Sequence, residues 1–381
     1  MDVPLILIEA GPGGAPALFV RPREVVVVHD GAGLAPALAR LDALRAAGAW
    51  LAGFVAYEAG YALEPRLVPL MRGDGPLLVI GVFDGPQDAA PFLARAAAGA
   101  DAARITAPEP QIGRAAYAAA FARLQAHIAA GDCYQANLTF PLKARLVTGT
   151  PCGLYGRLRQ AGVPGHGAFV DLGAGPVVVS LSPELFFRLD AEGRITARPM
   201  KGTRPRDADP ARDALLAAEL AASAKDRAEN LMIVDLLRND IGRLARPGSV
   251  RVPALHAVEL HPTVHQMTST IEAELAEPPA LATLLPALFP CGSVTGAPRI
   301  RAMEIIADLE PAPRGVYCGA VGWMAPDGRA DFSVAIRTLS VAGHDITLNV
   351  GGGVTVGSTA AGEWEEALWK TRFALAAVTP D

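Results

Sequence analysis

The feature that most constrains the fold is a succession of strand-like segments in the middle of the chain. YQANLTFPLKARL, GAFVDLG, GPVVVSLSPELFFRLD and GRITARPM follow one another between residues 134 and 200. Consecutive parallel strands need a long crossover, usually a helix, whereas antiparallel strands need only a short turn. Helical segments do not alternate strictly with strands here. The pattern therefore favours an α+β fold with large antiparallel sheets over a doubly wound parallel sheet.

The other segments suggest a shorter first part and a longer second part. Strand-like runs are found at 4–10, 24–30, 49–60 and 76–85, with one helical stretch at 34–48. Residues 86–110 are rich in Ala and Pro and weakly patterned, which indicates a connector or an exposed edge. Amphipathic helices are expected at 114–131, 213–244 and about 362–377. We therefore expect an N-terminal α/β segment, 1–100, that packs on a larger domain, 110–381.

Composition argues against several classes of protein. The net charge of −5 disfavours a general nucleic-acid binder, because such a protein needs a basic face. No stretch reaches the roughly 18–20 continuous apolar residues of a membrane span, and the N-terminus lacks the basic start of a signal peptide. Cys133, Cys152, Cys291 and Cys318 are far apart without CxxC spacing, which indicates reduced thiols. We expect a cytoplasmic protein that contacts neither nucleic acid nor membrane.

Carboxylates at helical spacing form the first candidate site. Glu363 and Glu366 are three residues apart on the last expected helix, and Lys370 follows four residues later, so all three share a face. Glu229 is another acidic position, surrounded by apolar residues at helical spacing. Carboxylates from two helices could hold one Mg²⁺, a hard cation that prefers oxygen ligands. The alternative is a solvated helix face with a Glu–Lys pair.

Three further features are ambiguous when taken alone. The glycines of 351–353 and of PCGSVTGAPR could bring backbone N–H groups to an anion, or they could form ordinary turns. Glu184, in SPELFF, is either an edge residue or a carboxyl in an apolar site, where a raised pKa suits a general acid. Arg337, in VAIRT, needs a carboxylate partner from the protein or from a substrate.

Lysine is rare in this chain, and one lysine lies among arginines. The 34 basic residues include only four lysines: Lys143, Lys201, Lys225 and Lys370. Lys201 lies within ARPMKGTRPR. A neutral lysine amine can act as a nucleophile, whereas arginine stays protonated because its pKa is above about 12. If the side chain at position 201 does covalent or base chemistry, arginine cannot replace lysine there. The alternative is that lysine occurs at this position by chance.

Taken together, these stretches resemble the chorismate-utilising enzymes, the family of anthranilate synthase component I and aminodeoxychorismate synthase component I. The resemblance runs in order from about Ile112 to Leu375. It is carried by GDCYQANLT, SPELFF, RPMKGT, KDRAENLMIVDLLRND, HPTVHQMTS, GSVTGAPRIRAMEII, YCGAVG, DFSVAIRT, GGGVTVGS and EWEEALWK. AWLAGFVAYEAGYALEP is similar to the aminodeoxychorismate branch. The resemblance implies two facing antiparallel sheets flanked by helices, and a chorismate-binding catalytic domain at 110–381.

The resemblance also implies a role for each matching residue. Glu229 and Glu366 would be Mg²⁺ ligands, with Glu363 close by, and the metal would take the ring carboxylate of chorismate. Tyr317 and Arg337 would take the other substrate carboxylate. Catalytic roles would fall to Lys201, to Glu184 as the acid that protonates the departing C4 hydroxyl, and to His265 near the substrate ring. The other substrate-binding residues would be Gln135, Thr203, Gly296, Ala297, Gly351, Gly352 and Lys370.

Two positions discriminate within the family. Members that add water have a lysine at the place of Gln135, so the isochorismate and salicylate synthases are disfavoured. Members that form anthranilate usually have Ala at the place of Lys201, whereas aminodeoxychorismate synthases carry PIKGT, close to the PMKGT found here. In the family mechanism the lysine amine adds at C2 while the C4 hydroxyl leaves, and ammonia then adds at C4 and expels the lysine. Candidate cationic neighbours of this lysine are Arg198, Arg204 and Arg206.

The resemblance therefore predicts Mg²⁺-dependent amination of chorismate at C4, giving 4-amino-4-deoxychorismate for 4-aminobenzoate and folate synthesis. The alternative is anthranilate synthase component I, which aminates C2 for tryptophan synthesis. Ammonia would come from a glutamine amidotransferase subunit, because no Cys-His-Glu glutaminase signature is found in the sequence. We do not expect a lyase half within these 381 residues.

Overall fold

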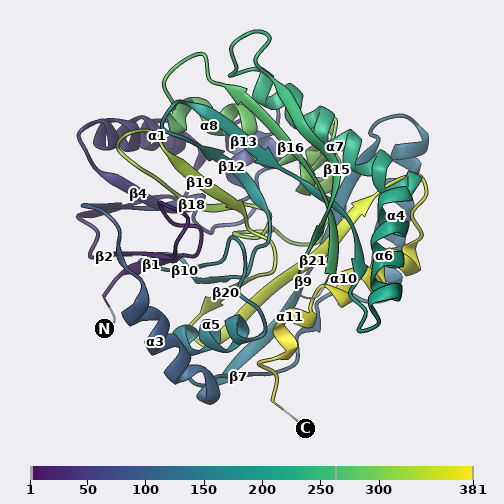
Figure 1. Ribbon diagram of the computed structural model, residues 1–381, viewed down its shortest axis with the longest axis horizontal. Helices are drawn as coiled ribbons and strands as arrows, with labels where there is room; N and C mark the ends of the chain where they lie inside the picture. Colours follow the sequence, from purple (N-terminus) through teal and green to yellow (C-terminus); the bar gives the residue numbers. More distant parts are fainter. Residues whose placement is uncertain (1–2, 262–263, 380–381) are drawn as a thin grey trace.

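The structure is a computed structural model that describes residues 3–261 and 264–379. Its described residues form two large sheets in which neighbouring strands are antiparallel (Figure 1). The first sheet has 11 strands. Its order is β17 (Gly296–Ala297), β9 (Gln135–Thr148), β21 (Asp345–Val354), β20 (Thr338–Ala342), β11 (Val177–Ser180), β10 (Ala168–Asp171), β1 (Leu5–Ile8), β2 (Ala17–Val20) and β6 (Gln87–Asp88), and β7 (Arg104–Ile105) and β8 (Glu109–Pro110) also pair with β9.

The second sheet has 10 strands among the described residues. Its order is β14 (Met200–Pro205), β16 (Val264–Glu274), β13 (Arg194–Arg198), β12 (Leu185–Leu189), β19 (Ala330–Val334), β18 (Ala320–Met324), β4 (Trp50–Val55), β5 (Leu78–Phe83) and β3 (Glu24–Val28), with β15 (Arg251–Leu260) beside β16. The expected α+β fold with two facing antiparallel sheets is confirmed.

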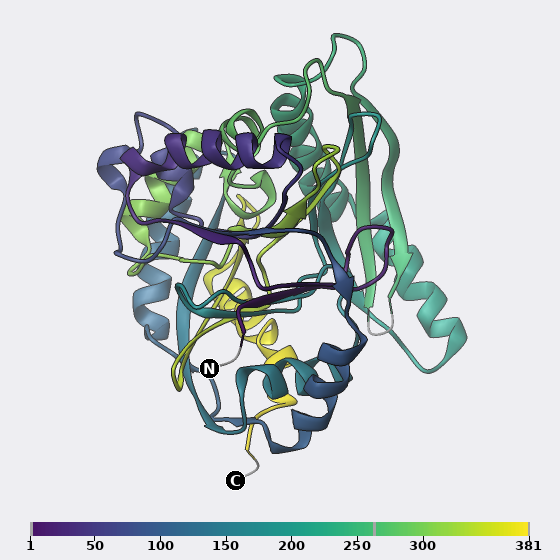
Figure 2. The same cartoon turned by 90° about the vertical axis from the view of Figure 1, so that its left-hand side faces the viewer.

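Helices cover the outer faces of both sheets. The outer face of the first sheet packs against α3 (Ala90–Gly99), α4 (Arg114–Ala129), α5 (Pro151–Gln160), α9 (Arg299–Leu309) and α10 (Ala360–Trp369). The outer face of the second sheet packs against α1 (Gly31–Ala46), α7 (Ala224–Gly242) and α8 (Leu281–Leu288). Shorter or peripheral helices are α2 (Ala59–Ala62), η1 (Val68–Leu70), η2 (Ala100–Ala102), α6 (Pro210–Ala222), η3 (Gly292–Val294) and α11 (Arg372–Leu375). Figure 2 shows α1, in dark purple, on one side of the sheets, and α3 and α5 on the other.

Central strands are apolar on both faces because both faces are buried. In β1, Leu5 and Leu7 belong to the core beneath the helices, whereas Ile6 and Ile8 belong to the core between the sheets. The side-chain period of two in a strand causes this division. Phe19 and Phe83 meet between the sheets with ring centroids 5.4 Å apart, so strands of both sheets share this inner core.

Strands of the first 100 residues continue both sheets. β1 pairs with β10, and β4 pairs with β18, so each sheet joins strands from the two ends of the chain. The division into 1–100 and 110–381 stays a prediction.

The expected helices are present, with breaks that the sequence pattern did not predict. The helix expected at 114–131 is α4. The block at 213–244 is two helices, α6 and α7, because Ser223 adopts an extended conformation between them and its side chain accepts a hydrogen bond from the Asp226 N–H. The last helix is likewise divided, into α10 and α11.

The segment 86–110, expected to be a connector or an exposed edge, does contribute the exposed edge strand β6 to the first sheet, but it is more than a connector. This segment contains α3, whose Phe92 and Ala96 are buried against the first sheet. A helix at 151–160, α5, was also missed, although Thr150 caps it and Pro151 begins it, which is a common start signal. Gly153 and Gly156 on α5 leave no room for a Cβ against the backbone of α3, which explains why these helices approach so closely.

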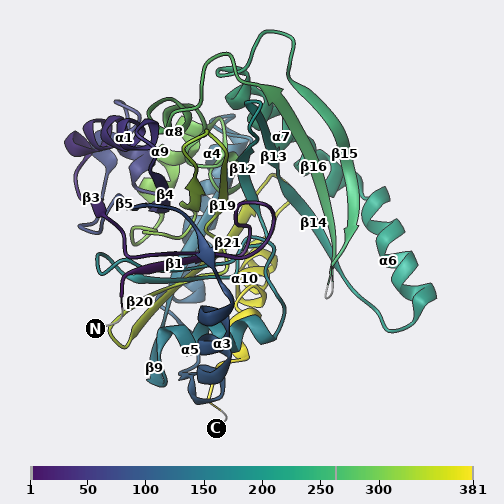
Figure 3. The same ribbon diagram turned by 60° about the vertical axis from the view of Figure 1, so that its left-hand side comes forward.

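The end of the second sheet projects beyond the sandwich. Figure 3 shows β14, β15 and β16 extending as an arm with α6 along it. This arm carries the Lys201 segment. In the same view, β21 of the other sheet and α10, which packs on that sheet, lie near the arm. Among the described residues, we find no helix with the length and apolar character needed to cross a membrane.

Candidate active site

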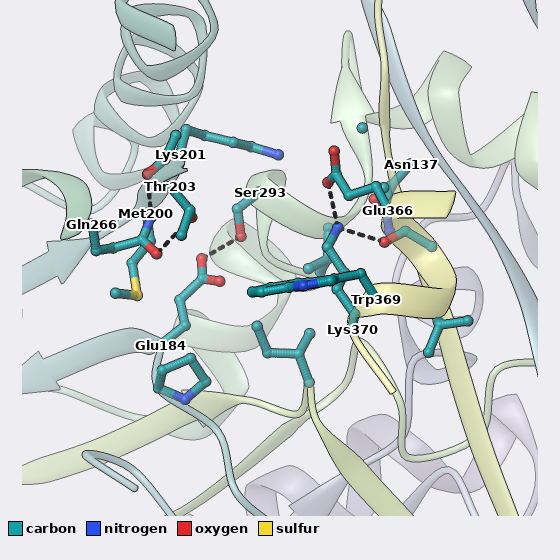
Figure 4. A pocket seen from close by; sticks show the side chains of 18 of the residues that line it. Asn137, Glu184, Met200, Lys201, Thr203, Gln266, Ser293, Glu366, Trp369 and Lys370 are labelled. Carbon is teal, nitrogen blue, oxygen red and sulfur yellow. Dashed lines mark hydrogen bonds and ion pairs between the residues drawn. The ribbon is translucent and has the colours of Figure 1, made fainter. Parts of the chain in front are cut away.

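A cavity of about 630 Å³ lies between β14, the start of α7, β21 and α10 (Figure 4). This is the size of a typical small-molecule site. Eleven of the residues selected from the sequence line it. They are Glu184, Lys201, Thr203, Glu229, Tyr317, Arg337, Gly351, Gly352, Glu363, Glu366 and Lys370. Residues separated by nearly 190 positions in the sequence therefore converge on one cavity.

Glu184 is a buried carboxyl that lies just before β12. Its backbone N–H bonds Ser182 Oγ at 3.2 Å, and its carboxylate accepts a 2.7 Å hydrogen bond from Ser293. Burial raises the pKa of Glu184, although Ser293, Lys201, His166 and Arg337 favour the ionised form. A carboxyl with a raised pKa can hold a proton and donate it, so the apolar-site reading of Glu184 agrees with this geometry.

Lys201 projects from an irregular part of β14. The pairing of β14 with β16 shifts register between Met200 and Thr203, and Gly202 has a φ of +84°. A Cβ at Gly202 would come within 2.9 Å of Asp226, so both conformation and space require glycine there. In Figure 4 the Lys201 side chain extends into the cavity. Because of this bulge, the Lys201 side chain does not follow the regular up-and-down alternation of side chains along the strand.

Gln266 of β16 fixes the turn that carries Lys201. Its side-chain nitrogen donates to the Gly202 carbonyl at 2.8 Å, and its oxygen accepts from Thr203 Oγ1 at 2.9 Å. The three arginines near Lys201 in the sequence are each paired with a carboxylate. The pairs are Arg198 with Glu259, Arg204 with Asp226, and Arg206 with Asp213.

His265 does not line the cavity. Its Nε2 lies 2.8 Å from Asp213 Oδ1, and Asp213 also pairs with Arg206. The hydrogen bonds from Arg206 are the main reason that the pKa of Asp213 is lowered. Neighbouring residues of a strand face opposite sides, so Gln266 faces the cavity and His265 faces α6. Strand alternation within VHQM predicts that the two residues face opposite sides, but not which of them faces the cavity.

Gly296 and Ala297 lie behind the cavity wall. They form β17 and pair with Ala136 and Gln135 of β9. A Cβ at Gly296 would lie 2.1 Å from the Gln135 carbonyl oxygen, so the turn fits only against the bare backbone. Gln135 itself is completely buried beside this turn. Gln135, Gly296 and Ala297 therefore lie behind the residues that line the cavity and do not line it themselves.

Tyr317 and Arg337 form the buried end of the cavity. Tyr317 precedes β18 of the second sheet, and Arg337, with a φ of +50°, lies between β19 of the second sheet and β20 of the first. Burial lowers the pKa of Arg337, and the negative charge of Glu184 partly offsets this effect. Burial raises the pKa of the Tyr317 hydroxyl, which keeps it a hydrogen-bond donor at neutral pH. A guanidinium and a phenol that line one cavity suit an anionic ligand such as a carboxylate.

Glu363 and Glu366 lie together on α10, and Glu229 of α7 lines the same cavity. Glu363 accepts a 2.6 Å bond from Ser358, and Glu366 lies 2.9 Å from Lys370 Nζ, which also donates to the Gly351 carbonyl at 2.8 Å. The position of a Cβ on Gly352 would be 2.9 Å from Glu363 Oε2 and 3.6 Å from Glu366 Oε1. A side chain at 352 would therefore displace the carboxylates from β21.

The protonation of these carboxylates follows their surroundings. Burial is the main cause that raises the pKa of Glu229 and of Glu363, and each also feels a neighbouring carboxylate. Burial also acts to raise the pKa of Glu366, but Lys370 outweighs it and the pKa falls. A cation placed among these groups would relieve the repulsion and the cost of burial.

The donor set fits Mg²⁺ better than a transition metal. The groups are carboxylate oxygens, which hard cations prefer. Within residues 3–261 and 264–379, no three His, Cys, Asp or Glu side chains are already arranged around one point as a metal cage. Mg²⁺ does not require such a cage, because one or two carboxylates commonly suffice when water and substrate complete its six ligands. Glu229 and Glu366 would hold it, with Glu363 beside them.

Other lining residues were missed from the sequence. They are Asn137, Ser293, Gln266, Asp226, Trp369 and Phe373. Trp369 is 46% exposed, and Figure 4 shows its indole within the group of side chains around the cavity. A large aromatic at the end of a helix, directly before Lys370, was the available signal. The Ser293–Glu184 contact had none, because 109 positions separate the two residues.

Comparison with known proteins finds a matching family model and several similar proteins. The model of the chorismate binding enzyme family matches residues 28–376. Over 262 residues the chain is 47% identical to aminodeoxychorismate synthase component 1 of Klebsiella aerogenes, covering 69% of this chain and 57% of that protein. It is 45% identical to anthranilate synthase component 1 of Streptomyces coelicolor, covering 68% and 50%. The chain thus spans little more than half the length of these relatives.

Solved structures share the fold over almost the whole chain. Anthranilate synthase component I from Streptococcus pneumoniae superposes with a TM-score of 0.75 at 24% sequence identity, covering 98% of this chain and 91% of that one. A 2,3-dihydroxybenzoate-specific isochorismate synthase from Bacillus anthracis gives a TM-score of 0.76 at 20% identity, covering 99% and 96%. At these identities the likeness concerns the fold, including the sheets that the sequence pattern predicted.

Proposed function

Because the chain belongs to the family of chorismate binding enzymes, we propose that it aminates chorismate at C4 to give 4-amino-4-deoxychorismate. The observation that carries the proposal is that Lys201 and Glu184 line one cavity. Lys201 is among the charges that favour the ionised Glu184 carboxyl, and both residues line the same cavity, so one bound substrate could contact both. A nucleophile and a proton donor at one cavity are what a displacement of the C4 hydroxyl needs.

The proposed amination proceeds in two successive displacement steps. In the first, the neutral Lys201 amine forms a bond to C2, the two conjugated ring double bonds shift, and the C4–O bond breaks. Glu184 donates its proton to the departing hydroxyl, which leaves as water. In the second, ammonia forms a bond to C4, the two double bonds shift back, and the C2–N bond breaks. The bonding electrons return to the Lys201 amine, and the new C4 ammonium loses one proton, which restores the acid form of Glu184.

The substrate would be held at both ends of the cavity. Arg337 and Tyr317 would bind the enolpyruvyl carboxylate by hydrogen bonds and charge. Glu229 and Glu366 would hold Mg²⁺ at the other end. When bound, Mg²⁺ would neutralise the ring carboxylate, whose charge the three glutamates would otherwise repel. The backbone of Gly351 and Gly352 leaves room for this carboxylate.

Ammonia would be supplied by a glutamine amidotransferase. The relative from Klebsiella aerogenes is named component 1, which supports a partner for the present chain. We expect free ammonium to support the reaction at high concentration. Glutamine would support it only after a partner subunit is added.

One assay tests the proposal. The protein is incubated with chorismate, Mg²⁺ and high ammonium, and the product is identified by mass and by treatment with a lyase that releases 4-aminobenzoate. We expect 4-amino-4-deoxychorismate. Direct appearance of anthranilate would instead support the second candidate, anthranilate synthase component I, which the 45% identity to the Streptomyces coelicolor enzyme favours. Isochorismate would refute both candidates.

A further inference from the structure

Gln135 contradicts the usual rule that buried polar groups are paired. It begins β9, and its side chain is completely buried. Neither the oxygen nor the nitrogen of its carboxamide has a hydrogen-bond partner among the described residues. An unpaired buried amide destabilises the folded protein and is therefore rare in native structures. Such a group is best explained by a function that requires it.

The carboxamide faces the amine of Lys201 across Gly353. Gln135 Nε2 lies 2.6 Å, and its Cδ 3.0 Å, from the point where a Cβ on Gly353 would be. Lys201 Nζ lies 3.2 Å from the same point. β9 and β14 belong to different sheets, so the two side chains reach this point from opposite walls. Gly353 has no left-handed φ, so glycine is needed there for space and not for backbone conformation.

The charges around Lys201 make an uncharged partner useful. Glu184, Glu229 and Glu366 all interact with its side chain electrostatically. A further carboxylate would bind this side chain as an ion pair, whereas attack on carbon needs the lone pair of an uncharged amine. An amide oxygen can accept a hydrogen bond from the amine without adding a negative charge. It can therefore hold the amine in one orientation while leaving it nucleophilic.

We propose that Gln135 is the positioning residue of Lys201: its carboxamide, which no hydrogen bond from the described residues holds, makes a half-turn that brings Oε1 to the place of Nε2 beside Gly353, where Oε1 accepts an N–H of the amine and directs the lone pair at the substrate ring. The inference rests on the proposed function, because it assumes that Lys201 forms a bond to the ring. Gln135 does not line the cavity itself, so it acts through Lys201 and does not contact the substrate.

The test follows formation of the covalent bond directly. The protein is mixed with chorismate and Mg²⁺ without ammonia, quenched in acid, and weighed intact to detect the adduct of protein plus chorismate minus water. We expect Gln135→Leu to slow adduct formation about tenfold to a hundredfold, the range of one lost hydrogen bond in a transition state. Its affinity for chorismate, from fluorescence titration, should change less than about twofold.

Two further variants provide independent evidence. Gly353→Ala places a methyl group between the carboxamide and the amine and should slow adduct formation as Gln135→Leu does. Gln135→Glu restores an acceptor of the same length at this position and should recover part of the adduct rate that Gln135→Leu loses. A merely structural role would give no such rescue by the conservative variant. Gln125→Leu, on α4, removes an amide that bonds the Thr355 carbonyl and should leave the rate unchanged.

Each outcome is decisive. Thermal unfolding of Gln135→Leu should occur at the same or a higher temperature, because the unpaired amide is removed. An unchanged adduct rate in both Gln135→Leu and Gly353→Ala would overturn the inference. A normal adduct rate combined with a higher ammonium requirement would also overturn it, and would assign the amide to binding ammonia instead. If the unmodified protein forms neither adduct nor 4-amino-4-deoxychorismate, the proposed function itself fails.

Discussion

Ser293 donates a 2.7 Å hydrogen bond to the carboxylate of Glu184, and both side chains are buried. Ser293 lies in η3, between α8 and β17, whereas Glu184 directly precedes β12. The bond favours the ionised carboxyl, against burial, which is the main influence and favours the protonated form. The balance between them sets the pH range in which Glu184 can donate a proton.

Ser293→Ala should change the pH dependence of the reaction. Without the hydrogen bond, the pKa of Glu184 rises further above its usual range. An acid that must be protonated loses activity as the pH rises through its pKa, so the basic limb of kcat/KM should move to higher pH. At its new optimum the rate should fall about tenfold, because one orienting hydrogen bond is lost. Ser333→Ala, which removes a buried hydroxyl bonded to the Val321 carbonyl, is the control and should leave the profile unshifted.

Replacing Lys201 should abolish C4 amination. We expect at least about a thousandfold loss in Lys201→Ala, because the covalent route is lost, with anthranilate as the residual product. Lys201→Arg keeps the positive charge but cannot attack carbon, so it should be equally inactive. Product analysis by mass distinguishes the two amination sites. Lys143→Ala, an exposed lysine bonded to Thr347, should behave as the unmodified protein. Activity retained by Lys201→Arg would show that charge alone is needed.

Removing one proposed metal ligand should raise the Mg²⁺ requirement. Glu229→Gln keeps the shape of the side chain but removes its charge, so half-maximal activity should need at least about tenfold more Mg²⁺. Calorimetric titration with Mg²⁺ measures the same loss without turnover. Glu365→Gln is the matched control, because Glu365 is on α10 but is paired with Arg114 and exposed. Equal Mg²⁺ dependence in both variants would exclude Glu229 as a ligand.

Trp369 should report ligand binding through its fluorescence. It is 46% exposed at the cavity, whereas Trp364 is stacked on Phe140 with centroids 4.8 Å apart and Trp323 lies between the sheets. Bound chorismate should cover the indole, and Trp369→Ala should raise KM about tenfold through lost apolar contact. Trp369→Phe should abolish the change in emission caused by chorismate. The same emission change in Trp369→Phe would place the indole away from the ligand.

Arg314 should stabilise the elements behind the cavity. It is 4% exposed and binds Glu310 at 2.7 Å, the Val294 carbonyl at 2.8 Å and the Asn137 carbonyl at 2.6 Å. Arg314→Met should lower the free energy of unfolding by about 3–5 kcal/mol, because Glu310 is left buried without its cationic partner, although the Thr139 N–H still donates to it at 2.8 Å. Urea denaturation measures this change.

A surface pair is the comparison for Arg314. Arg329→Met breaks an exposed contact with Asp327 and should cost no more than about 1 kcal/mol. A loss as small in Arg314→Met would mean that Glu310 finds another partner or takes up a proton. Measuring Arg314→Met together with Glu310→Gln separates these cases, since the double variant should be more stable than Arg314→Met alone.

Local patterns in the sequence predicted those features of the structure that depend on residues close together in the chain. The spacing of Glu363, Glu366 and Lys370 puts them on one helical face, and the structure keeps them together. Adjacent strand-like runs predicted antiparallel sheets for the same reason, because a period of two and short turns are local properties. Family motifs added the remaining candidates, most of which line the cavity.

Other features needed the tertiary structure. The bulge at Gly202 sets the direction of Lys201, and the alternation of β16 turns His265 toward Asp213 while Gln266 faces the cavity. Neither direction follows from composition, because the register of a strand depends on its partner.

The sequence by itself determined the antiparallel fold class and the residue types available for nucleophilic, acid and metal-binding roles. Only the tertiary structure decided which of them meet. Gln135 and Lys201 are 66 positions apart and lie in different sheets, yet they converge on Gly353. Ser293 and Glu184 meet in the same way. Such contacts arise because burying both faces of each sheet fixes how distant strands pack, and a linear pattern contains no record of that packing.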